Sequence, residues 1–267
     1  MRRRSRCLPP GCAITGNTAV DDLPRSRGLL LAGLVLGTWA ALHIWSVFLI
    51  EIDRTPLWLT SSLILLLCWL SVGLFIVAHD AMHGSLAPGR PGLSRAIGRL
   101  CLFVYAGFSF DRLLPKHMAH HRHAGTAEDP DFHAPAPRDV FRWYGAFFRQ
   151  YFGLRELAMM SAMIAVYLFL LGARYENLLL FWALPSILSS MQLFFFGTYL
   201  PHCAGDDFVD RHRARSADVP VWASLLSCYH FGYHHEHHRW PHVPWWGLPA
   251  ARRRAKAEAA LGSGGRV

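Results

Sequence analysis

The stretch PLWLTSSLILLLCWLSVGLFIVAHDAMH, residues 56–83, decides the fold and locates the chemistry of this chain. Its first 23 residues carry no formal charge, and a bilayer core takes roughly 20 residues of α-helix. The run ends directly on His79 and His83, which are four residues apart and share one face of a continuing helix. The stretch therefore predicts a transmembrane helix that delivers two imidazoles to one end of the membrane.

Three further uncharged runs occur in the 267 residues, of which 52% are hydrophobic. They cover residues 28–50, 157–173 and 178–200, and the run at 157–173 is the shortest. Buried helices of soluble proteins seldom have uncharged runs of this length. We therefore expect an all-α integral membrane protein with four transmembrane helices, arranged as two hairpins.

The basic residues indicate the orientation. Of the 27 Lys and Arg residues, 25 lie in segments 1–27, 79–155 and 201–267, and only Arg54 and Arg174 lie in the two short turns. Basic residues favour the cytoplasmic side of a membrane. We expect a multi-pass protein of the cytoplasmic (inner) membrane, with both termini and all histidine clusters cytoplasmic. The net charge of +9 is thus mainly an orientation signal with some attraction to lipid headgroups, and no nucleic-acid-binding motif accompanies it.

Composition also suggests the domain organisation. Residues 1–27 are basic and interrupted by prolines, which predicts a flexible tail; residues 28–249 form the membrane domain, and residues 250–267 a basic C-terminal tail. The apolar stretch 100–110 is too short to cross a bilayer and is expected in the interface or against the core. The six cysteines form no C-x-x-C pair, which argues against a zinc finger and a disulfide framework.

Two more histidine clusters lie on the same predicted side. Each has the pattern H-x-x-H-H, so we expect each cluster to aim its rings at one point. Neutral imidazoles suit iron, copper or zinc. With His202 at the end of the last run, nine candidate ligands result, enough for two metal ions with four or five nitrogens each and a position for oxygen. They are His79, His83, His117, His120, His121, His202, His234, His237 and His238.

Acidic residues near the clusters are expected to orient these ligands, because metal-bound histidines usually donate their other N–H to a carboxylate or carbonyl. A solvated turn with a helix cap is the open alternative for the three acids at 128–131. His230 could be a tenth ligand or another supporting residue. His43, alone in an apolar run, is interpreted as a packed or hydrogen-bonded residue. The supporting set is Asp80, Glu128, Asp129, Asp131, His230 and Glu236.

The three histidine clusters resemble the histidine motifs, called histidine boxes, of the membrane fatty-acid desaturase and hydroxylase superfamily. The narrower resemblance is to the bacterial β-carotene ketolases of the C4-oxygenase type, over about residues 28–250. The segments that carry it are AHDAMHG (78–84), RLL (112–114) leading into KH (116–117), EDPDFH (128–133), TYLPH (198–202), FGYHHEHH (231–238) and VPWW (243–246).

The resemblance implies two non-haem iron ions, O2 as co-substrate and an external reduced ferredoxin-like electron donor, since the chain has no flavin, haem or nicotinamide motif. It also implies a carotenoid substrate from the bilayer. Two hydroxylations at C4 of a β-ionone ring, followed by loss of water, would convert β-carotene to echinenone and then canthaxanthin. The histidines would hold iron, and no catalytic residue beyond the metal ligands is expected.

Two other functions remain open from the sequence. A membrane fatty-acyl desaturase or hydroxylase would share the three histidine boxes. A histidine-rich metal transporter should place polar groups along its spans, and here His43 and Gln192 are the main candidates besides a few hydroxyls.

Overall fold

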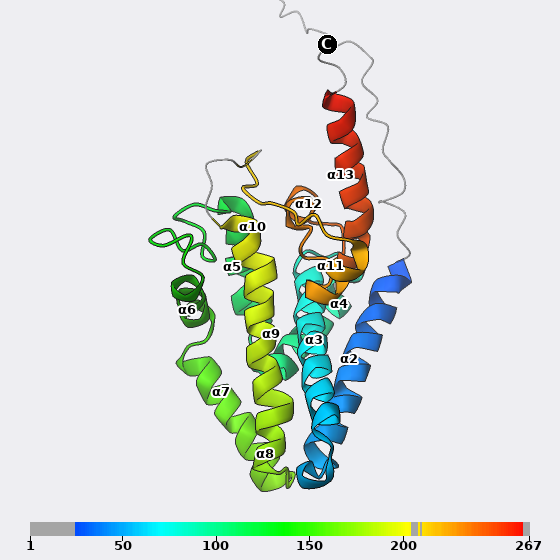
Figure 1. The fold of residues 1–267 in the computed structure, drawn as a ribbon, viewed down its shortest axis with the longest axis vertical. Helices are drawn as coiled ribbons and strands as arrows, with labels where there is room; N and C mark the ends of the chain where they lie inside the picture. The colour runs from blue at the N-terminus through cyan, green and yellow to red at the C-terminus, as the bar shows by residue number, and fades with distance from the viewer. Residues whose placement is uncertain (1–24, 204–207, 209, 264–267) are drawn as a thin grey trace, which may run out of the picture.

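The computed structural model describes residues 25–203, 208 and 210–263, and within these the regular structure is helical (Figure 1). The predicted tail at 1–27 lies outside the described residues except for its last three. The α-helices are α2 (Arg25–Phe48), α3 (Leu57–Met82), α4 (Pro91–Ala106), α5 (Phe110–His123), α6 (Val140–Tyr151), α7 (Leu154–Ala165), α8 (Tyr175–Leu178), α9 (Leu184–Phe194), α10 (Leu200–His202), α11 (Val221–Cys228), α12 (His234–Arg239) and α13 (Leu248–Ser263). Short turns of 3-10 helix lie at Ile52–Arg54 and Trp245–Gly247, and π-helical turns at Val166–Leu170, Leu179–Ala183 and Phe195–Tyr199.

Three apolar helices are long enough to cross a membrane: Ser26–Phe48, Leu57–Met82 and Tyr175–His202. They confirm three of the four predicted apolar runs as long helices. Residues 157–170 of the run at 157–173 lie in the second arm of a bent pair, Val140–Tyr151 with Leu154–Leu170, which bends by 74°. A second bent pair, Pro91–Ala106 with Phe110–His123, turns by 100°. Its break includes Gly107, whose φ of +67° is a conformation that glycine adopts readily.

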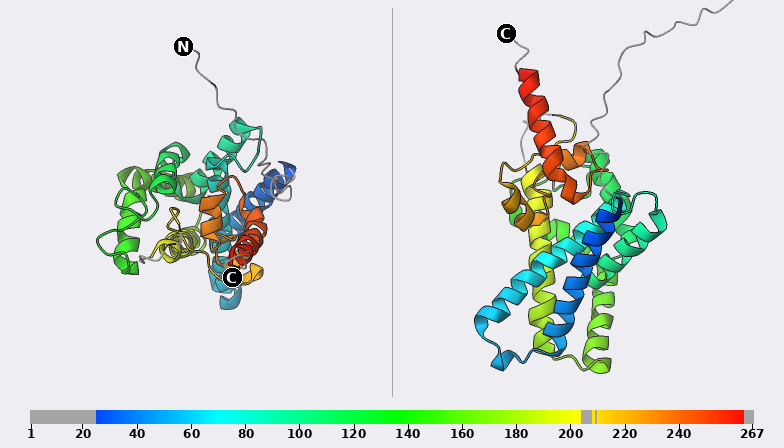
Figure 2. Two further views of the ribbon diagram at one scale, coloured as in Figure 1. Left: turned by 90° about the horizontal axis from the view of Figure 1, so that it is seen from above. Right: turned by 90° about the vertical axis from the view of Figure 1, so that its right-hand side faces the viewer.

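Helix α3 is the central element, and it packs against α2, α4 and α9 (Figures 1 and 2). The stretch 100–110, expected in the interface or against the core, forms the end of α4 and the start of α5 and packs against the core. Gly98 makes this contact possible, because a Cβ there would lie 2.6 Å from Phe110 Cε2 and 2.9 Å from Ala81 Cβ.

The outer surface of the helices is apolar. Leu57, Leu65, Phe169 and Leu170 are more than 60% exposed, and an apolar belt of this kind matches a lipid environment better than water. Inside the bundle, some buried polar side chains pair with one another. His43 Nε2 lies 3.0 Å from Tyr167 Oη, which confirms the interpretation of His43 as a hydrogen-bonded packing residue.

The last three helices lie together at one end of the bundle. Helices α11, α12 and α13 lie at the end opposite the two short turns that join α2 to α3 and α7 to α8 (Figure 1). Most of the predicted C-terminal tail is helical: α13 is rich in Ala and Arg, which favour helix, and Leu248 and Ala251 at its base are fully buried.

Candidate metal centre

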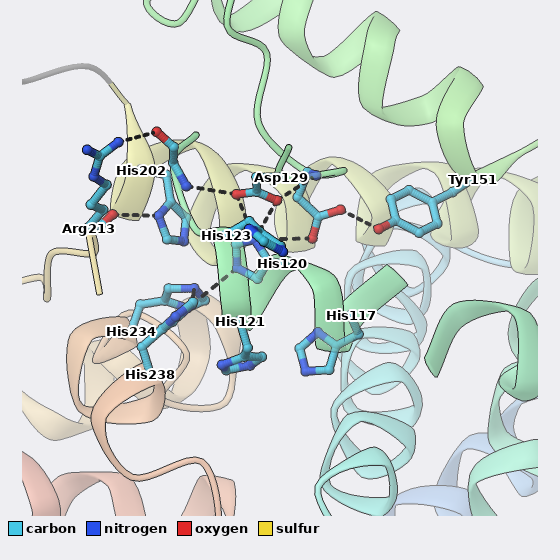
Figure 3. A network of polar contacts seen from close by, with 12 residues as sticks. His117, His120, His121, His123, Asp129, Tyr151, His202, Arg213, His234 and His238 are labelled. Atoms are coloured by element: carbon cyan, nitrogen blue, oxygen red, sulfur yellow. Dashed lines mark hydrogen bonds and ion pairs between the residues drawn. The ribbon is translucent and has the colours of Figure 1, made fainter. Parts of the chain in front are cut away.

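The nine histidines singled out from the sequence converge at this end of the bundle, where their elements meet. His79 and His83 end α3, His202 ends α10, and the two H-x-x-H-H boxes lie in α5 and α12. Figure 3 shows part of this cluster, with rings from α5, α10 and α12 directed at one another. Segments more than 100 residues apart in sequence thus bring their imidazoles together.

The nine rings form two groups, within each of which the candidate ligand atoms all lie within 4.8 Å of one another. The first contains five residues, His79, His83, His117, His121 and His237, and the second contains four, His120, His202, His234 and His238. Both groups are built from imidazole alone, so the donor set is one that transition metals accept.

The expectation that each box aims at one point is wrong for both H-x-x-H-H boxes. In α5, His117 and His121 join the first group and His120 the second; in α12, His234 and His238 join the second group and His237 the first. A helix turns about 100° per residue, so residues i and i+4 differ by about 40° whereas i+3 and i+4 differ by about 100°. The middle histidine of each box therefore faces the other group.

Within each group, nitrogens approach one another closely. In the first group, His83 Nε2 lies 2.7 Å from His117 Nε2, and His121 Nε2 lies 3.0 Å from His237 Nε2. In the second group, His238 Nε2 lies 3.1 Å from His120 Nε2 and 3.0 Å from that of His234. Facing lone pairs at these distances repel unless a proton or a cation lies between them. The arrangement therefore fits a bound cation.

Two of the rings are oriented by hydrogen bonds on their other nitrogen. His120 Nδ1 lies 2.9 Å from Asp129 Oδ1, and His202 Nδ1 donates to the Arg213 carbonyl at 2.8 Å (Figure 3). Each bond directs Nε2 into the second group. The buried His202 Nε2, and both nitrogens of His79, have no hydrogen-bond partner among the described residues. Unpartnered buried nitrogens aimed at other imidazoles are what a metal site requires.

The protonation states of the three histidines of α12 also fit a metal. Burial, reinforced by the neighbouring imidazoles, lowers the pKa of His234, His237 and His238 well below the usual histidine value. These rings are therefore neutral at pH 7, the form that binds metal.

Asp129 and Asp131 lie beside His120. Burial tends to raise the pKa of Asp129, but its bonds to His120 and to backbone N–H groups hold it below the usual value, so the carboxylate stays ionised. Asp131 Oδ2 is 3.8 Å from His120 Nδ1, and its other oxygen accepts a hydrogen bond from the Tyr151 hydroxyl. Burial raises the pKa of Asp131.

The other expected supporting residues are placed differently. Asp80 is buried, with Oδ1 3.8 Å from His79 Nδ1, and it accepts from the Trp245 backbone N–H. His230 belongs to neither histidine group but stacks with Tyr233 and with Trp245. Glu128 is exposed and belongs to neither histidine group.

Glu236 is completely buried, yet its hydrogen bonds go to Ser216 and Arg252 and not to an imidazole ring. Its role is therefore that of a partner to α13 and to the segment before α11.

A pocket of about 980 Å³ of empty space, its open mouth included, leads to the histidines. Its wall is predominantly aromatic and apolar, and Tyr144 and Ser190, joined by a 2.8 Å hydrogen bond, supply two of its few polar groups. The lining residues are Phe75, His79, Met82, Tyr105, Phe108, Leu113, His117, His120, Asp131, Tyr144, Phe147, Phe148, Tyr151, Phe152, Ser190, Leu193, Gly197, Thr198, Phe231 and His234.

Several residues of the site were not expected from the sequence. Tyr151 reaches Asp131 from α6, 20 residues further along the chain, and no spacing signal links them. The Arg213 carbonyl that orients His202 is a backbone group, so no residue type identifies it. Gly197 and Thr198 line the pocket from the π-helical turn Phe195–Tyr199, and π-helical turns are frequent at functional sites.

Comparison with known proteins shows the family of this chain. The sequence pattern of the family described as fatty acid desaturase matches residues 54–161 and 139–265. The beta-carotene ketolase of Paracoccus sp. strain PC1 is 50% identical over 90% of this chain and 95% of its own length. The chain belongs to the β-carotene ketolases of the fatty acid desaturase family. The ketolase of Paracoccus sp. strain N81106 is 51% identical over 85% of this chain and 93% of its own length. The beta-carotene ketolase of Haematococcus lacustris is 38% identical over 85% of this chain and 79% of its own length.

Proposed function

We propose that this chain is a membrane-bound, O2-dependent carotenoid 4-ketolase that converts β-carotene to echinenone and canthaxanthin. The observation that carries the proposal is the aromatic pocket that ends on His79, His117, His120 and His234. A substrate with a long conjugated chain suits such walls, because flat π-systems pack well against aromatic rings. The ketolases at 50% and 51% identity support the same reaction.

Two iron ions would occupy the two histidine groups, one held by five imidazoles and the other by four. Bound iron would supply O2 activation, as is general for the family, with electrons from a ferredoxin-type donor outside the chain. The chain's own residues hold the imidazole nitrogens in place, and Asp129 fixes His120 through a 2.9 Å hydrogen bond. Neither group of imidazoles contains a carboxylate, but Asp129 and Asp131 form a third cluster of possible ligand atoms with His120. We assign these two acids to supporting roles.

The reaction balances as two successive hydroxylations at one carbon. Each inserts one oxygen atom of O2 into a C4–H bond and, with two electrons and two protons from the donor system, reduces the other atom to water. The resulting geminal diol loses water to give the ketone. The pocket contributes by excluding bulk water and by orienting the ring, with the hydroxyls of Tyr151 and Thr198 among its few polar groups.

The proposed topology is four spans arranged as two hairpins: α2 with α3, and α7 with the helix Tyr175–His202. Both hairpin turns lie at the end of the bundle opposite the histidines (Figure 1). The turns hold only Arg54 and Arg174 of the 27 basic residues, which favours the cytoplasmic side for the histidines and both termini. We place the chain in the inner membrane, with residues 28–249 as the ketolase domain.

The test is pigment chromatography with mass detection, after expression in a bacterium that accumulates β-carotene. We expect products with one and then two ketone groups from the wild-type chain and none from His120→Ala. The exposed His242 provides the matched control, and His242→Ala should convert β-carotene as the wild type does. Unchanged β-carotene with the wild-type protein present in the membrane would refute the proposal and direct attention to the lipids.

A further inference from the structure

Glu236 is a buried carboxylate at the centre of α12 that the metal centre does not use directly. It is 0% exposed and lies between His235 and His237 in the sequence. One of its oxygens accepts a hydrogen bond from the Ser216 hydroxyl, and the other accepts from Arg252 Nη1 at 2.9 Å. A buried charge without a partner is strongly unfavourable, so the guanidinium of Arg252 is the group that makes this position tenable.

Arg252 comes from α13, whose first turns belong to the core. Its side chain is only 21% exposed, and Nη2 lies 3.8 Å from Asp218 Oδ1. Leu248 and Ala251, on the turn before it, are 0% exposed. The guanidinium is therefore presented to Glu236 from a fixed backbone.

The C-terminal end of α12 is held by the same helix. The guanidinium groups of Arg239 and Arg254 lie 4.3 Å and 5.1 Å from the ring centre of Trp240, the residue that follows α12. Both arginines bond to Glu258 of α13 at 2.8 Å. Helix α13 thus contacts α12 at its middle and at its end.

Helix α12 supplies ligands to both groups, with His237 in the first and His234 and His238 in the second. We propose that Arg252 is a positioning residue for the metal centre: by neutralising Glu236 it fixes the rotation of α12, so that the three histidines face their groups. The inference rests on the metal ligands proposed above. It makes the C-terminal helix part of the site and not a tail.

The test compares Arg252→Met, which keeps the side-chain volume and removes the charge, with Arg253→Met on the exposed neighbouring residue. The full chain is purified in detergent, its folding is checked by gel filtration, and bound iron is titrated with a chelator. We expect Arg252→Met to lose iron at about 10- to 100-fold lower chelator concentration, the usual effect of removing a group that orients a ligand. Arg253→Met should match the wild type.

The rescue variant separates charge neutralisation from packing. In Arg252→Met/Glu236→Gln, the buried charge is gone and Ser216 can still donate to the amide oxygen, so most of the iron affinity should return. Wild-type iron retention in Arg252→Met, or a double variant as poor as Arg252→Met, would overturn the proposal. Should Arg252→Met fail to fold, recovery of folded, iron-loaded double variant supports it and continued failure overturns it. Because iron is measured separately from pigment, a protein that binds iron through this arrangement but makes no ketone would refute only the proposed function.

Discussion

Replacing Asp129 with asparagine should weaken the four-histidine group without unfolding the chain. The Asp129 carboxylate accepts four contacts: His120 Nδ1 lies 2.9 Å from Oδ1 and 3.0 Å from Oδ2, the Asp131 N–H is 2.8 Å from Oδ1, and the Gly125 N–H is 2.9 Å from Oδ2. An asparagine offers one oxygen and one NH2 group in the same space. In either orientation the NH2 group meets a backbone N–H, and one donor loses its acceptor.

The expected loss of metal affinity follows from the hydrogen bonds that the asparagine cannot make. A buried donor left without a partner costs about 1–3 kcal/mol, and the bond that orients His120 also loses the assistance of the negative charge. Metal binding must then supply the free energy that returns the His120 ring to its orientation. A cost of this size, at about 1.4 kcal/mol for each factor of ten in affinity, corresponds to roughly 10- to 100-fold weaker metal binding. Mutations of groups that orient metal-bound histidines have effects of about the same size.

The assay is the chelator titration of bound iron on the purified protein, with ketone formation measured on the same preparations. The matched control is Glu128→Gln, a neighbouring carboxyl that is exposed and lies outside both histidine groups. It should leave iron retention and product formation unchanged. Wild-type iron retention together with full ketone formation in Asp129→Asn would show that His120 needs no carboxylate to hold its orientation, and would refute this reasoning.

Three further predictions concern the bundle. Gly98→Ala should lower the free energy of unfolding by about 1–3 kcal/mol, because the added Cβ would lie 2.6 Å from Phe110 Cε2. In the control variant Gly92→Ala, on the same helix, the added Cβ meets nothing within 4 Å, so the change should be neutral or slightly stabilising. Thermal unfolding in detergent compares the two variants. Asn177→Ala should destabilise by about 1–3 kcal/mol, because Asn177 Nδ2 donates at 2.9–3.1 Å to three backbone carbonyls, two in the last turn of α2 and one just after it. An unchanged melting temperature would contradict this. His43→Phe should retain full iron content by metal analysis, since His43 bonds to a tyrosine hydroxyl and lies outside both histidine groups; loss of iron from a folded protein would count against the assignment of ligands.

The sequence predicted the parts of the fold that depend on local pattern. Uncharged runs of 23 residues predicted three of the long helices, because a bilayer demands both length and apolarity. The bends could not be predicted in the same way. The 100° turn between α4 and α5 depends on how Gly107 and its neighbours pack, and a Cβ at Gly107 would lie 2.7 Å from Met159 Cγ on α7. That contact joins residues 52 positions apart, for which a single sequence carries no signal.

In the site, too, local features were predictable from the sequence and tertiary contacts were not. The histidine spacing predicted eight of the nine residues that meet, and the place of His202 at the end of an apolar run predicted the ninth. Residue type, helical spacing and apolar runs are all local properties. Their division into groups depends on how α5 and α12 face each other, and that angle is set by tertiary packing. The partners of Asp131 and His202, namely the Tyr151 hydroxyl and the Arg213 carbonyl, are likewise contacts between distant segments.

The division of the two boxes has a consequence for how the two groups depend on each other. His79 and His83 are four apart on α3 and serve one group, whereas α5 and α12 each serve both. A rotation of α5 that withdraws His120 from the second group must also move His117 and His121 in the first. Damage to one group through α5 or α12 is therefore transmitted to the other, while a change at His202 of α10 should affect the second group alone. The extra histidine in H-x-x-H-H, compared with H-x-x-x-H, is the residue that couples the two groups.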